Sequence, residues 1–366
     1  MEKNILMIVY NDLNIDSRVQ RNAEVLSKLG NLTIIHSGKN KSCDNNYNCI
    51  SIYSKYKGNI IKYMSFVKNT IRYVNKNKKN NLFYANDFFS ALPLIIIKLL
   101  KKSDKFVYDA HELYIPEKNK KFSIRDYFFY FMEKFAIKNS DLIICAQDNR
   151  AEIMKEHYKL KNKPLVIRNI SLLPKKDEYK LDVQLKEFFE NDSIKIVYSG
   201  IISKERNLCD VIDSVNLLNK NYKLLIIGYG DGVNEIKDKL SSINNKKILY
   251  IGKVEYNNMY SILKKCDIGV ISYPTEGLNN LYCAPNKIFE YASVGLPMVS
   301  FYNPSIKEEF KKYNIGIAKN NIEDAIIEVS NNINFFKDNL KIFLESNSWE
   351  KESCKFYEVL DRILKQ

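Results

Sequence analysis

Long hydrophobic runs are missing from this sequence of 366 residues. The longest apolar stretch, near residues 92–100, is broken by Pro93 and Lys98, so the sequence predicts no helix that spans a membrane. The N-terminus leads directly into a short apolar strand at residues 5–9, which is too short for the core of a signal peptide. We therefore expect a cytoplasmic protein.

Cysteine pairs of the C-x-x-C type are also absent. The seven cysteines are odd in number and scattered along the chain, a pattern typical of proteins in a reducing compartment. The same spacing argues against a structural zinc site.

Negative charge is scarce in the first half of the chain. Residues 1–170 hold 30 Lys and Arg against 16 Asp and Glu, whereas residues 171–366 hold 27 of each, so the first half carries the whole net charge of +14. This excess indicates an anionic partner: nucleic acid, an anionic bilayer or a phosphorylated acceptor. A solvated basic surface without a partner is the alternative. Nucleic acid is the least favoured partner, because no base-reading module is recognisable.

Aromatic residues are concentrated at residues 125–135, where they are mixed with charges, and Lys98, Lys101 and Lys102 follow an apolar run. Packing of these aromatics in the core is the default explanation. A surface patch that docks on anionic lipid is the alternative. Both explanations remain open from the sequence.

Short apolar strands alternate with helical stretches in both halves of the chain. The predicted strands are 5–9, 32–36, 82–84, 106–108, 142–145, 165–167, 194–198, 223–227, 248–251 and 268–271. The predicted helices include 17–29, 208–218, 233–240 and 259–265. This pattern predicts an α/β protein with two doubly wound parallel sheets, and a polar, proline-bearing segment at 172–180 is predicted to link them. Functional residues are then expected in loops that follow strands.

The most informative segment is 285–297, P-N-K-I-F-E-Y-A-S-V-G-L-P. Pro285 is suited to begin a helix, and Gly295 with Pro297 is suited to end it. Lys287 and Glu290 lie three residues apart on one face of that helix. Lys287 and the free N–H groups of the first turn suit an anionic ligand, and Glu290 suits a ribose diol. The alternative is an ordinary exposed ion pair.

This segment resembles the nucleotide-sugar site of retaining glycosyltransferase family 4, in the variant P-N-K-x-x-E-Y-x-x-x-G-x-P. The resemblance implies the GT-B fold, two Rossmann-like doubly wound parallel-sheet domains facing an interdomain cleft. It implies an acceptor-binding domain at 1–171, a nucleotide-sugar domain at 181–345, and a last helix at 346–366 that returns to the first domain. In the family's usual Glu-x7-Glu motif the second Glu binds the donor ribose and matches Glu290, whereas the first falls on Tyr282.

Other segments of the second half resemble the family's donor site. The turn from Tyr198 through Gly200 to Arg206 is similar to the turn that holds the donor diphosphate, and the resemblance gives Asn286 and Lys287 the same role. The Arg that often follows this Gly is replaced by Ile201. Gly228 and Gly230 belong to a glycine-rich turn whose third Gly is one residue early for NAD binding. We expect this turn, with Tyr282 and Pro285, to line the donor cleft.

Further resemblances lie in the first half. Asp16-x-Arg18-Val19-x-Arg21, the loop Tyr108–Leu113 and the segment Val166–Asn169 are similar to family elements in the family's order. The resemblance implies that His111, at the end of a strand, sits beside the transferred sugar as the catalytic-site histidine. It implies that Asp16, Arg18 and Glu112 lie on the acceptor side.

Taken together, the resemblance implies a hexosyltransferase that transfers a sugar with retention from a UDP- or GDP-sugar to a glycan or lipid-linked acceptor. Cell-surface polysaccharide or glycolipid biosynthesis in a bacterium is the expected setting, at the inner face of the cell membrane. We expect no cofactor and no metal, since no Asp-x-Asp cluster is present. The alternatives are a nucleotide-sugar 2-epimerase of the same fold and a non-catalytic membrane-associated subunit, the latter because of Tyr282 and Ile201.

Overall fold

A computed structural model describes most of the chain. The described residues are 3–13, 16–39, 46–117, 121–171, 173, 181–219, 221–243 and 247–366. The chain divides into two compact units, unit 1 (Met1–Asn169 with Trp349–Gln366) and unit 2 (Ile170–Ser348). Apart from Leu173, the predicted linker at 172–180 lies outside the described residues.

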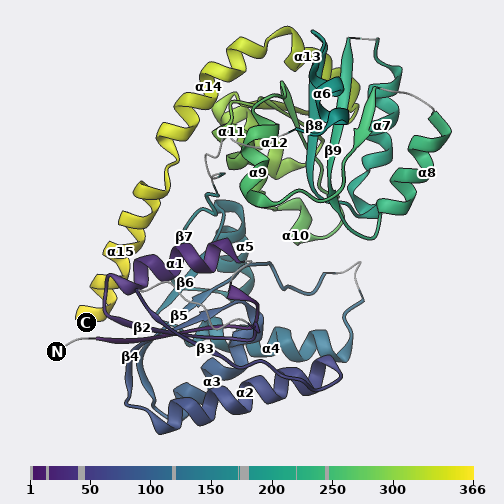
Figure 1. Ribbon diagram of the computed structural model, residues 1–366. Helices are drawn as coiled ribbons and strands as arrows, with labels where there is room; N and C mark the ends of the chain where they lie inside the picture. Colours follow the sequence, from purple (N-terminus) through teal and green to yellow (C-terminus); the bar gives the residue numbers. More distant parts are fainter. Residues whose placement is uncertain are drawn as a thin grey trace. The chain divides into compact units, whose positions relative to one another are not determined.

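In the described part of unit 1, seven parallel strands form one sheet in the order β3-β2-β1-β4-β5-β6-β7 (Figure 1). The strands are β1 (Asn4–Val9), β2 (Asn31–His36), β3 (Asn48–Ser51), β4 (Asn80–Asn86), β5 (Ser103–Asp109), β6 (Leu142–Cys145) and β7 (Leu165–Val166). In the centre, Ile5 of β1 lies between Leu32 of β2 and Leu82 of β4. The central strands are apolar throughout because helices cover both faces of the sheet.

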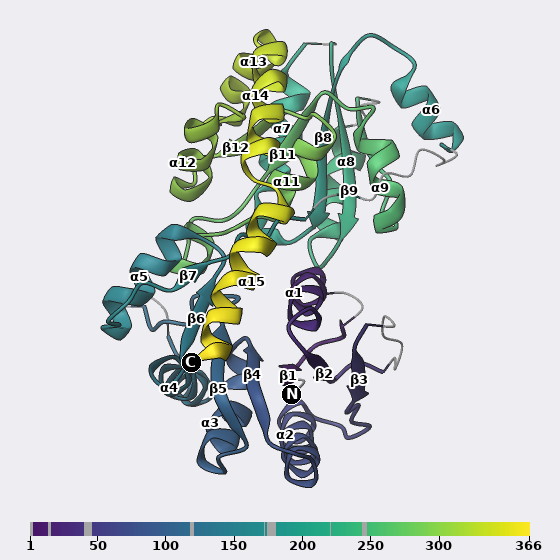
Figure 2. The same ribbon diagram turned by 90° about the vertical axis from the view of Figure 1, so that its left-hand side faces the viewer.

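Helices of unit 1 form a layer on each face of this sheet. They are α1 (Ser17–Ser27), α2 (Asn59–Lys76), α3 (Ala91–Leu99), α4 (Ile124–Lys138), α5 (Asp148–Tyr158) and α15 (Trp349–Lys365), with a short 3-10 turn at Phe88–Ser90. The helices α1 and α15 cover one face, and α2, α3 and α4 cover the other (Figures 1 and 2). Phe356 and Leu360 of α15 are buried in the same core as Val19 and Leu26 of α1. The C-terminal helix therefore completes unit 1.

In the described part of unit 2, six parallel strands form a sheet in the order β10-β9-β8-β11-β12-β13. The strands are β8 (Ile194–Ile201), β9 (Tyr222–Tyr229), β10 (Ile248–Tyr250), β11 (Ile268–Ile271), β12 (Met298–Phe301) and β13 (Gly316–Lys319). The helices are α6 (Val183–Phe189), α7 (Leu208–Leu217), α8 (Val233–Ile243), α9 (Tyr256–Leu263), α10 (Leu278–Leu281), α11 (Asn286–Ser293), α12 (Pro304–Tyr313), α13 (Ile322–Asn331) and α14 (Ile333–Ser346), with a 3-10 turn at Lys204–Arg206. The two parallel sheets confirm the predicted fold class.

The helix α11 illustrates how the sequence specifies an element. It begins directly after Pro285 and is followed by Gly295 at φ 75°, as the segment predicts. The ring of Tyr291 on α11 packs against Gly269 of β11, where an added Cβ would lie 2.5 Å from the ring. Gly269 is therefore required for α11 to approach the sheet.

The structure bears on two features noted in the sequence, the lack of long apolar runs and the cysteines. Among the residues that the structure describes, no helix is both long enough and apolar enough to cross a bilayer. Cys145, Cys209, Cys266, Cys283 and Cys354 are not in disulfides. Cys49 is disulfide-bonded.

Candidate active site

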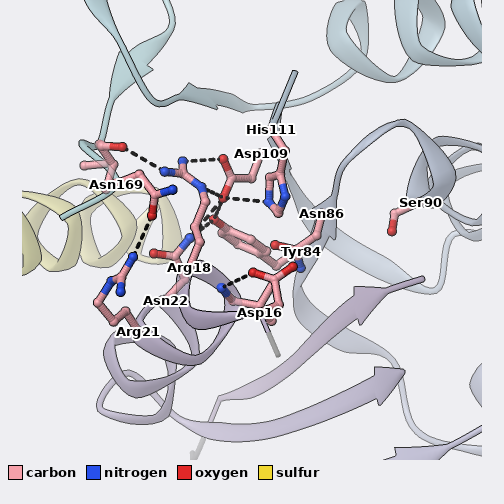
Figure 3. A network of polar contacts seen from close by, with 12 residues as sticks. Asp16, Arg18, Arg21, Asn22, Tyr84, Asn86, Ser90, Asp109, His111 and Asn169 are labelled. Atoms are coloured by element: carbon pink, nitrogen blue, oxygen red, sulfur yellow. Dashed lines mark hydrogen bonds and ion pairs between the residues drawn. The ribbon is translucent and has the colours of Figure 1, made fainter. Parts of the chain in front are cut away.

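A buried polar network surrounds Asp109 at the end of β5 (Figure 3). Arg18 of α1 donates to Asp109 Oδ1 from Nη2 at 2.6 Å and to Oδ2 from Nε at 3.1 Å. The hydroxyl of Tyr84 and the side-chain amide of Asn22 donate to Oδ2 at 2.8 and 2.9 Å. Burial alone would raise the pKa of Asp109, but Arg18 and His111 outweigh it and hold this pKa well below its ordinary value. Asp109 therefore remains a carboxylate.

His111 lies two residues after Asp109. Its Nε2 is 3.7 Å from Asp109 Oδ2, too far for a good hydrogen bond, and this buried nitrogen has no other hydrogen-bond partner among the described residues. Its backbone carbonyl accepts from Arg150 Nη1 at 2.7 Å, which fixes the loop. Burial lowers the pKa of His111, but Asp109 and Asp87 more than offset burial and raise it. The imidazole is thus held in place with hydrogen-bonding capacity left for a ligand.

A pocket of about 250 Å³ opens beside His111. Its lining residues are Val9, Tyr10, Asn11, Asp16, Asn86, Asp87, Phe89 and His111. Asn86 Oδ1 and Asp87 Oδ1 are buried and lack hydrogen-bond partners in the described part of the chain. Buried oxygens of this kind ordinarily have partners, so a hydroxyl-bearing ligand would satisfy them.

Asp87 was not singled out from the sequence. It follows β4 directly, and its backbone takes φ 60° and ψ 170°, a conformation that is nearly confined to glycine. Burial raises the pKa of Asp87 to about 6, with His111 acting in the opposite direction. The rule that sites gather at the carboxyl ends of parallel strands could have found Asp87, because the strand at 82–84 was predicted.

The residues predicted on the acceptor side are not all at this pocket. Asp16 lines it, caps α1 by accepting from Val19 N at 3.1 Å, and accepts from Asn11 Nδ2 at 3.3 Å. Arg18 is instead held by Asp109 and donates to the carbonyl of Ile167 at 3.0 Å. Glu112 is exposed. The geometry favours a positioning role for Arg18.

Unit 2 carries a second polar site at the carboxyl ends of β8, β9 and β11. Gly200 lies at the end of β8, where an added Cβ would contact the hydroxyl of Tyr198 at 3.6 Å and Cε of Lys287 at 3.7 Å. A Cβ on the neighbouring Gly228 would lie 1.9 Å from the carbonyl oxygen of Gly200, and one on Gly230 would lie 2.0 Å from that of Ile202. Glycine is therefore required at 228 and 230 for the two loops to pass each other.

Arg206 is fixed at this same edge by groups that follow β11. Its Nη1 donates to the carbonyl of Ser272 at 3.2 Å, and the Ser272 hydroxyl donates back to the carbonyl of Arg206 at 2.5 Å. The guanidinium lies over the ring of Tyr273, 4.0 Å from its centroid. The cation is thus oriented without a partner carboxylate being needed.

The first turn of α11 brings a second cation to Gly200. Lys287 forms an ion pair with Glu290, and the two side chains are only 23% and 6% exposed, so this is not the exposed pair that the spacing alone allowed. Pro285 provides no side-chain cap, and Asn286 Oδ1 is buried without a partner within the described residues. An uncapped helix start beside a lysine suits an anionic group.

Tyr291 holds α11 in register with the sheet. Its hydroxyl accepts from the backbone N–H of Ser199 at 2.9 Å and donates to the carbonyl of Val270 at 3.2 Å. This links α11 to β8 and β11, so Gly200, Arg206 and Lys287 are held at one edge. Tyr282, at the C-terminal end of α10, is half-buried, and Pro285 is buried. Both belong to the connection that leads into α11.

Comparisons with known proteins agree with this architecture. Residues 180–352, most of unit 2, match the family "Glycosyl transferases group 1". The chain is 25% identical over 296 residues to an uncharacterized glycosyltransferase of Methanocaldococcus jannaschii, a match that covers 76% of this chain and 74% of the relative.

Solved structures share the whole fold. Sucrose-phosphate synthase from Thermosynechococcus elongatus superposes with a TM-score of 0.76 at 13% identity and covers 99% of each chain. HepE of Anabaena, in complex with UDP and glucose, gives a TM-score of 0.72 at 12% identity and covers 98% of this chain and 100% of its own. At these identities the likeness concerns the fold alone. The fold is GT-B, and residues 180–352 are similar to the glycosyl transferases group 1.

Proposed function

We propose that this chain is a retaining hexosyltransferase of family 4 that uses a UDP- or GDP-sugar as donor. One observation carries the proposal: Lys287 at the uncapped start of α11 lies beside Gly200, and Arg206 contacts Tyr198 of the same strand, β8, at one edge of the unit 2 sheet. Two cations and free backbone amides complement the charge and the oxygen acceptors of a diphosphate. Glu290, three residues after Lys287, accepts hydrogen bonds from the donor ribose.

Each group has a defined role in the proposed reaction. The bond between the anomeric carbon and the diphosphate oxygen breaks, and its electron pair leaves with the diphosphate. Arg206 and Lys287 stabilise that developing charge, Lys287 exchanging its contact with Glu290 for a phosphate oxygen. The acceptor oxygen bonds to the anomeric carbon on the same face, and its proton passes to the leaving phosphate oxygen. His111 and Asp87 contact hydroxyl groups of the transferred sugar or the acceptor.

A diphosphate donor is also favoured by HepE of Anabaena, which has this fold and was determined with UDP and glucose. The acceptor proposed for unit 1 is a glycan or a lipid-linked sugar, in cell-surface polysaccharide or glycolipid synthesis. Its hydroxyls would satisfy the buried oxygens of Asn86 and Asp87. No metal and no cofactor enter the proposal, because Arg206 and Lys287 supply the positive charge.

A thermal-shift screen of UDP- and GDP-sugars in the presence of EDTA tests this function. A nucleotide sugar at about 100 times its dissociation constant should stabilise the protein by roughly 2.7 kcal/mol. Transfer assays with the stabilising donor and lipid-linked or glycan acceptors then follow. No shift with any donor would overturn the proposal in favour of a non-catalytic subunit. Isomerisation of the donor sugar without an acceptor would overturn it in favour of an epimerase.

A further inference from the structure

The helix α4 carries apolar side chains on both of its faces. Its inner face is buried in unit 1 through Phe129, Tyr130, Ala136 and Ile137. On its outer face four large apolar side chains are exposed: Ile124 (92%), Phe128 (44%), Phe131 (54%) and Phe135 (43%). Their spacing of three to four residues places them in one stripe along the helix. A surface helix that only covers a sheet carries polar residues there, so this stripe is unexplained by the packing of unit 1.

Helix α2 also exposes large apolar side chains near its N-terminal end. Ile60, Ile61 and Met64 of α2 are 69%, 56% and 50% exposed. The ring of Tyr63 on α2 meets the ring of Phe129 on α4, with centroids 5.5 Å apart, so the N-terminal halves of the two helices are neighbours. Both helices lie on the same side of the unit 1 sheet (Figures 1 and 2). We call the seven exposed residues Ile60, Ile61, Met64, Ile124, Phe128, Phe131 and Phe135 the α2–α4 face.

Both helices of this face carry basic residues. Helix α2 contains Lys62, Lys68, Arg72 and Lys76 and no Asp or Glu. On α4, Arg125, Lys134 and Lys138 flank the apolar stripe. Long basic side chains at the margin of an apolar stripe can lie along it and keep their charges in the headgroup layer of a bilayer.

The two acidic residues of α4 offset only part of this charge. Asp126 forms the capping box with Ser123 at the helix start and lies 3.8 Å from Arg125, so it offsets one positive charge. Glu133 is buried, and its Oε1 accepts from the hydroxyl of Tyr108 at 2.8 Å. Burial raises the pKa of Glu133 well above its ordinary value, which favours the neutral carboxyl group. The surface that α4 presents is therefore apolar and cationic.

We infer that the α2–α4 face docks on an anionic phospholipid bilayer. The aromatic and aliphatic side chains would enter the boundary between headgroups and acyl chains, and the flanking lysines and arginines would contact lipid phosphates. A second copy of this chain fits the face less well, because pairing it with itself would bring two cationic surfaces together. The inference is independent of the proposed donor and reaction. It adds a bilayer as a partner, and a lipid-linked acceptor would lie in the same bilayer.

Sedimentation of the full chain with vesicles tests the inference. We expect binding to vesicles of phosphatidylcholine mixed with phosphatidylglycerol, no binding to phosphatidylcholine alone, and weaker binding as salt is raised. Two triple variants, Phe128→Ser/Phe131→Ser/Phe135→Ser and Lys68→Glu/Arg125→Glu/Lys138→Glu, should each lower the partition coefficient by at least about tenfold. The matched control, Phe335→Ser/Ile342→Ser, removes exposed apolar residues of α14 in unit 2 and should bind like the unaltered chain.

Three results would overturn the inference. The first is no binding of the unaltered chain to the anionic vesicles, and the second is unchanged binding in both triple variants. The third is self-association, measured by light scattering, that the phenylalanine variant abolishes while vesicle binding is absent; the face would then join two copies of the chain. Unchanged thermal unfolding verifies that the variants fold. A retained nucleotide-sugar shift in both triple variants separates this test from that of the donor site.

Discussion

Unit 1 and unit 2 share a parallel-sheet architecture, but different kinds of groups form their polar sites. In unit 1 the site rests on charges inside the protein, with Arg18 and Asp109 both buried. In unit 2 it rests on backbone turns that only glycine allows, at Gly228 and Gly230, and on cations that reach the edge of the sheet. Substitutions in the unit 1 network should therefore change stability, and substitutions in the unit 2 site should change ligand binding.

The distribution of charge shows the same contrast. Residues 171–366 hold equal numbers of basic and acidic side chains, yet unit 2 carries the proposed diphosphate site. Local placement of Arg206 and Lys287, and not net charge, makes that site cationic. In unit 1 the pocket contains Asp16 and Asp87, so the basic excess of the first half lies elsewhere, notably around the α2–α4 face.

The largest effect on stability is expected for Arg18→Ala. This change removes both hydrogen bonds from Arg18 to Asp109 and leaves a buried carboxylate without its cation. We expect the free energy of unfolding to fall by about 3–5 kcal/mol. Urea unfolding followed by circular dichroism measures it. The double variant Arg18→Ala/Asp109→Asn should recover part of the loss, and a loss below about 1 kcal/mol in the single variant would show that unit 1 does not depend on this pair.

In unit 2, by contrast, Lys287→Ala should lower activity more than stability. Because it removes one of the two cations proposed to stabilise the leaving diphosphate, we expect kcat/KM for the stabilising donor to fall by about 10²–10³. Steady-state transfer assays measure this. Stability should fall by only about 2 kcal/mol, since Glu290 loses its partner but remains at the edge of the unit.

A second substitution separates these two effects of Lys287. Adding Glu290→Gln to Lys287→Ala removes the unpaired carboxylate and should restore most of the lost stability. It should not restore turnover. Turnover near the normal rate in Lys287→Ala would remove this residue from the proposed reaction.

Much of the fold could be predicted from the sequence because its signals are local. Runs such as Ile5–Val9 and Ile268–Ile271 are apolar throughout, as strands buried on both faces must be. Pro285 and Gly295 fix the ends of α11 by backbone preference alone. The edge strand β3 (Asn48–Ser51) was missed, because a half-buried strand with polar residues has no such run.

The candidate site was less predictable because its signals are tertiary. Arg18 and Asp109 are 91 residues apart, and no local pattern indicates that one neutralises the other. The aromatics of residues 125–135 were left open between core and surface, and the structure divides them: Phe129 is buried, whereas Phe128 and Phe131 are exposed. Which face of α4 meets the core depends on α3, α5 and the 3-10 turn at Phe88–Ser90, so helical spacing alone could not decide it.

The smallest expected effect concerns Asp87 in the unit 1 pocket. It tests whether burial of this carboxylate destabilises the folded chain. Burial raises the pKa of Asp87 from 3.8 to about 6, so the folded chain binds this proton more tightly than the unfolded chain does. The resulting contribution to stability is complete below about pH 3.8 and is lost as the pH rises through about 6. Asp87→Asn removes the charge and keeps nearly the same side-chain shape on the same backbone. We expect the free energy of unfolding of this variant to exceed that of the unaltered chain by about 3 kcal/mol at pH 7.5 and to match it near pH 4.

Asp126→Asn is the matched control, because the pKa of Asp126 is shifted the other way. Hydrogen bonds from Ser123 lower it to about 2, so its contribution to stability is present above about pH 3.8 and is lost as the pH falls toward 2. The control should therefore be less stable than the unaltered chain at pH 7.5, and the difference should shrink in acid. Urea unfolding at several pH values measures both differences. If Asp87→Asn were destabilising at pH 7.5, favourable contacts would stabilise the Asp87 carboxylate, as they stabilise that of Asp109. The conclusion that burial of Asp87 destabilises the folded chain would then be wrong.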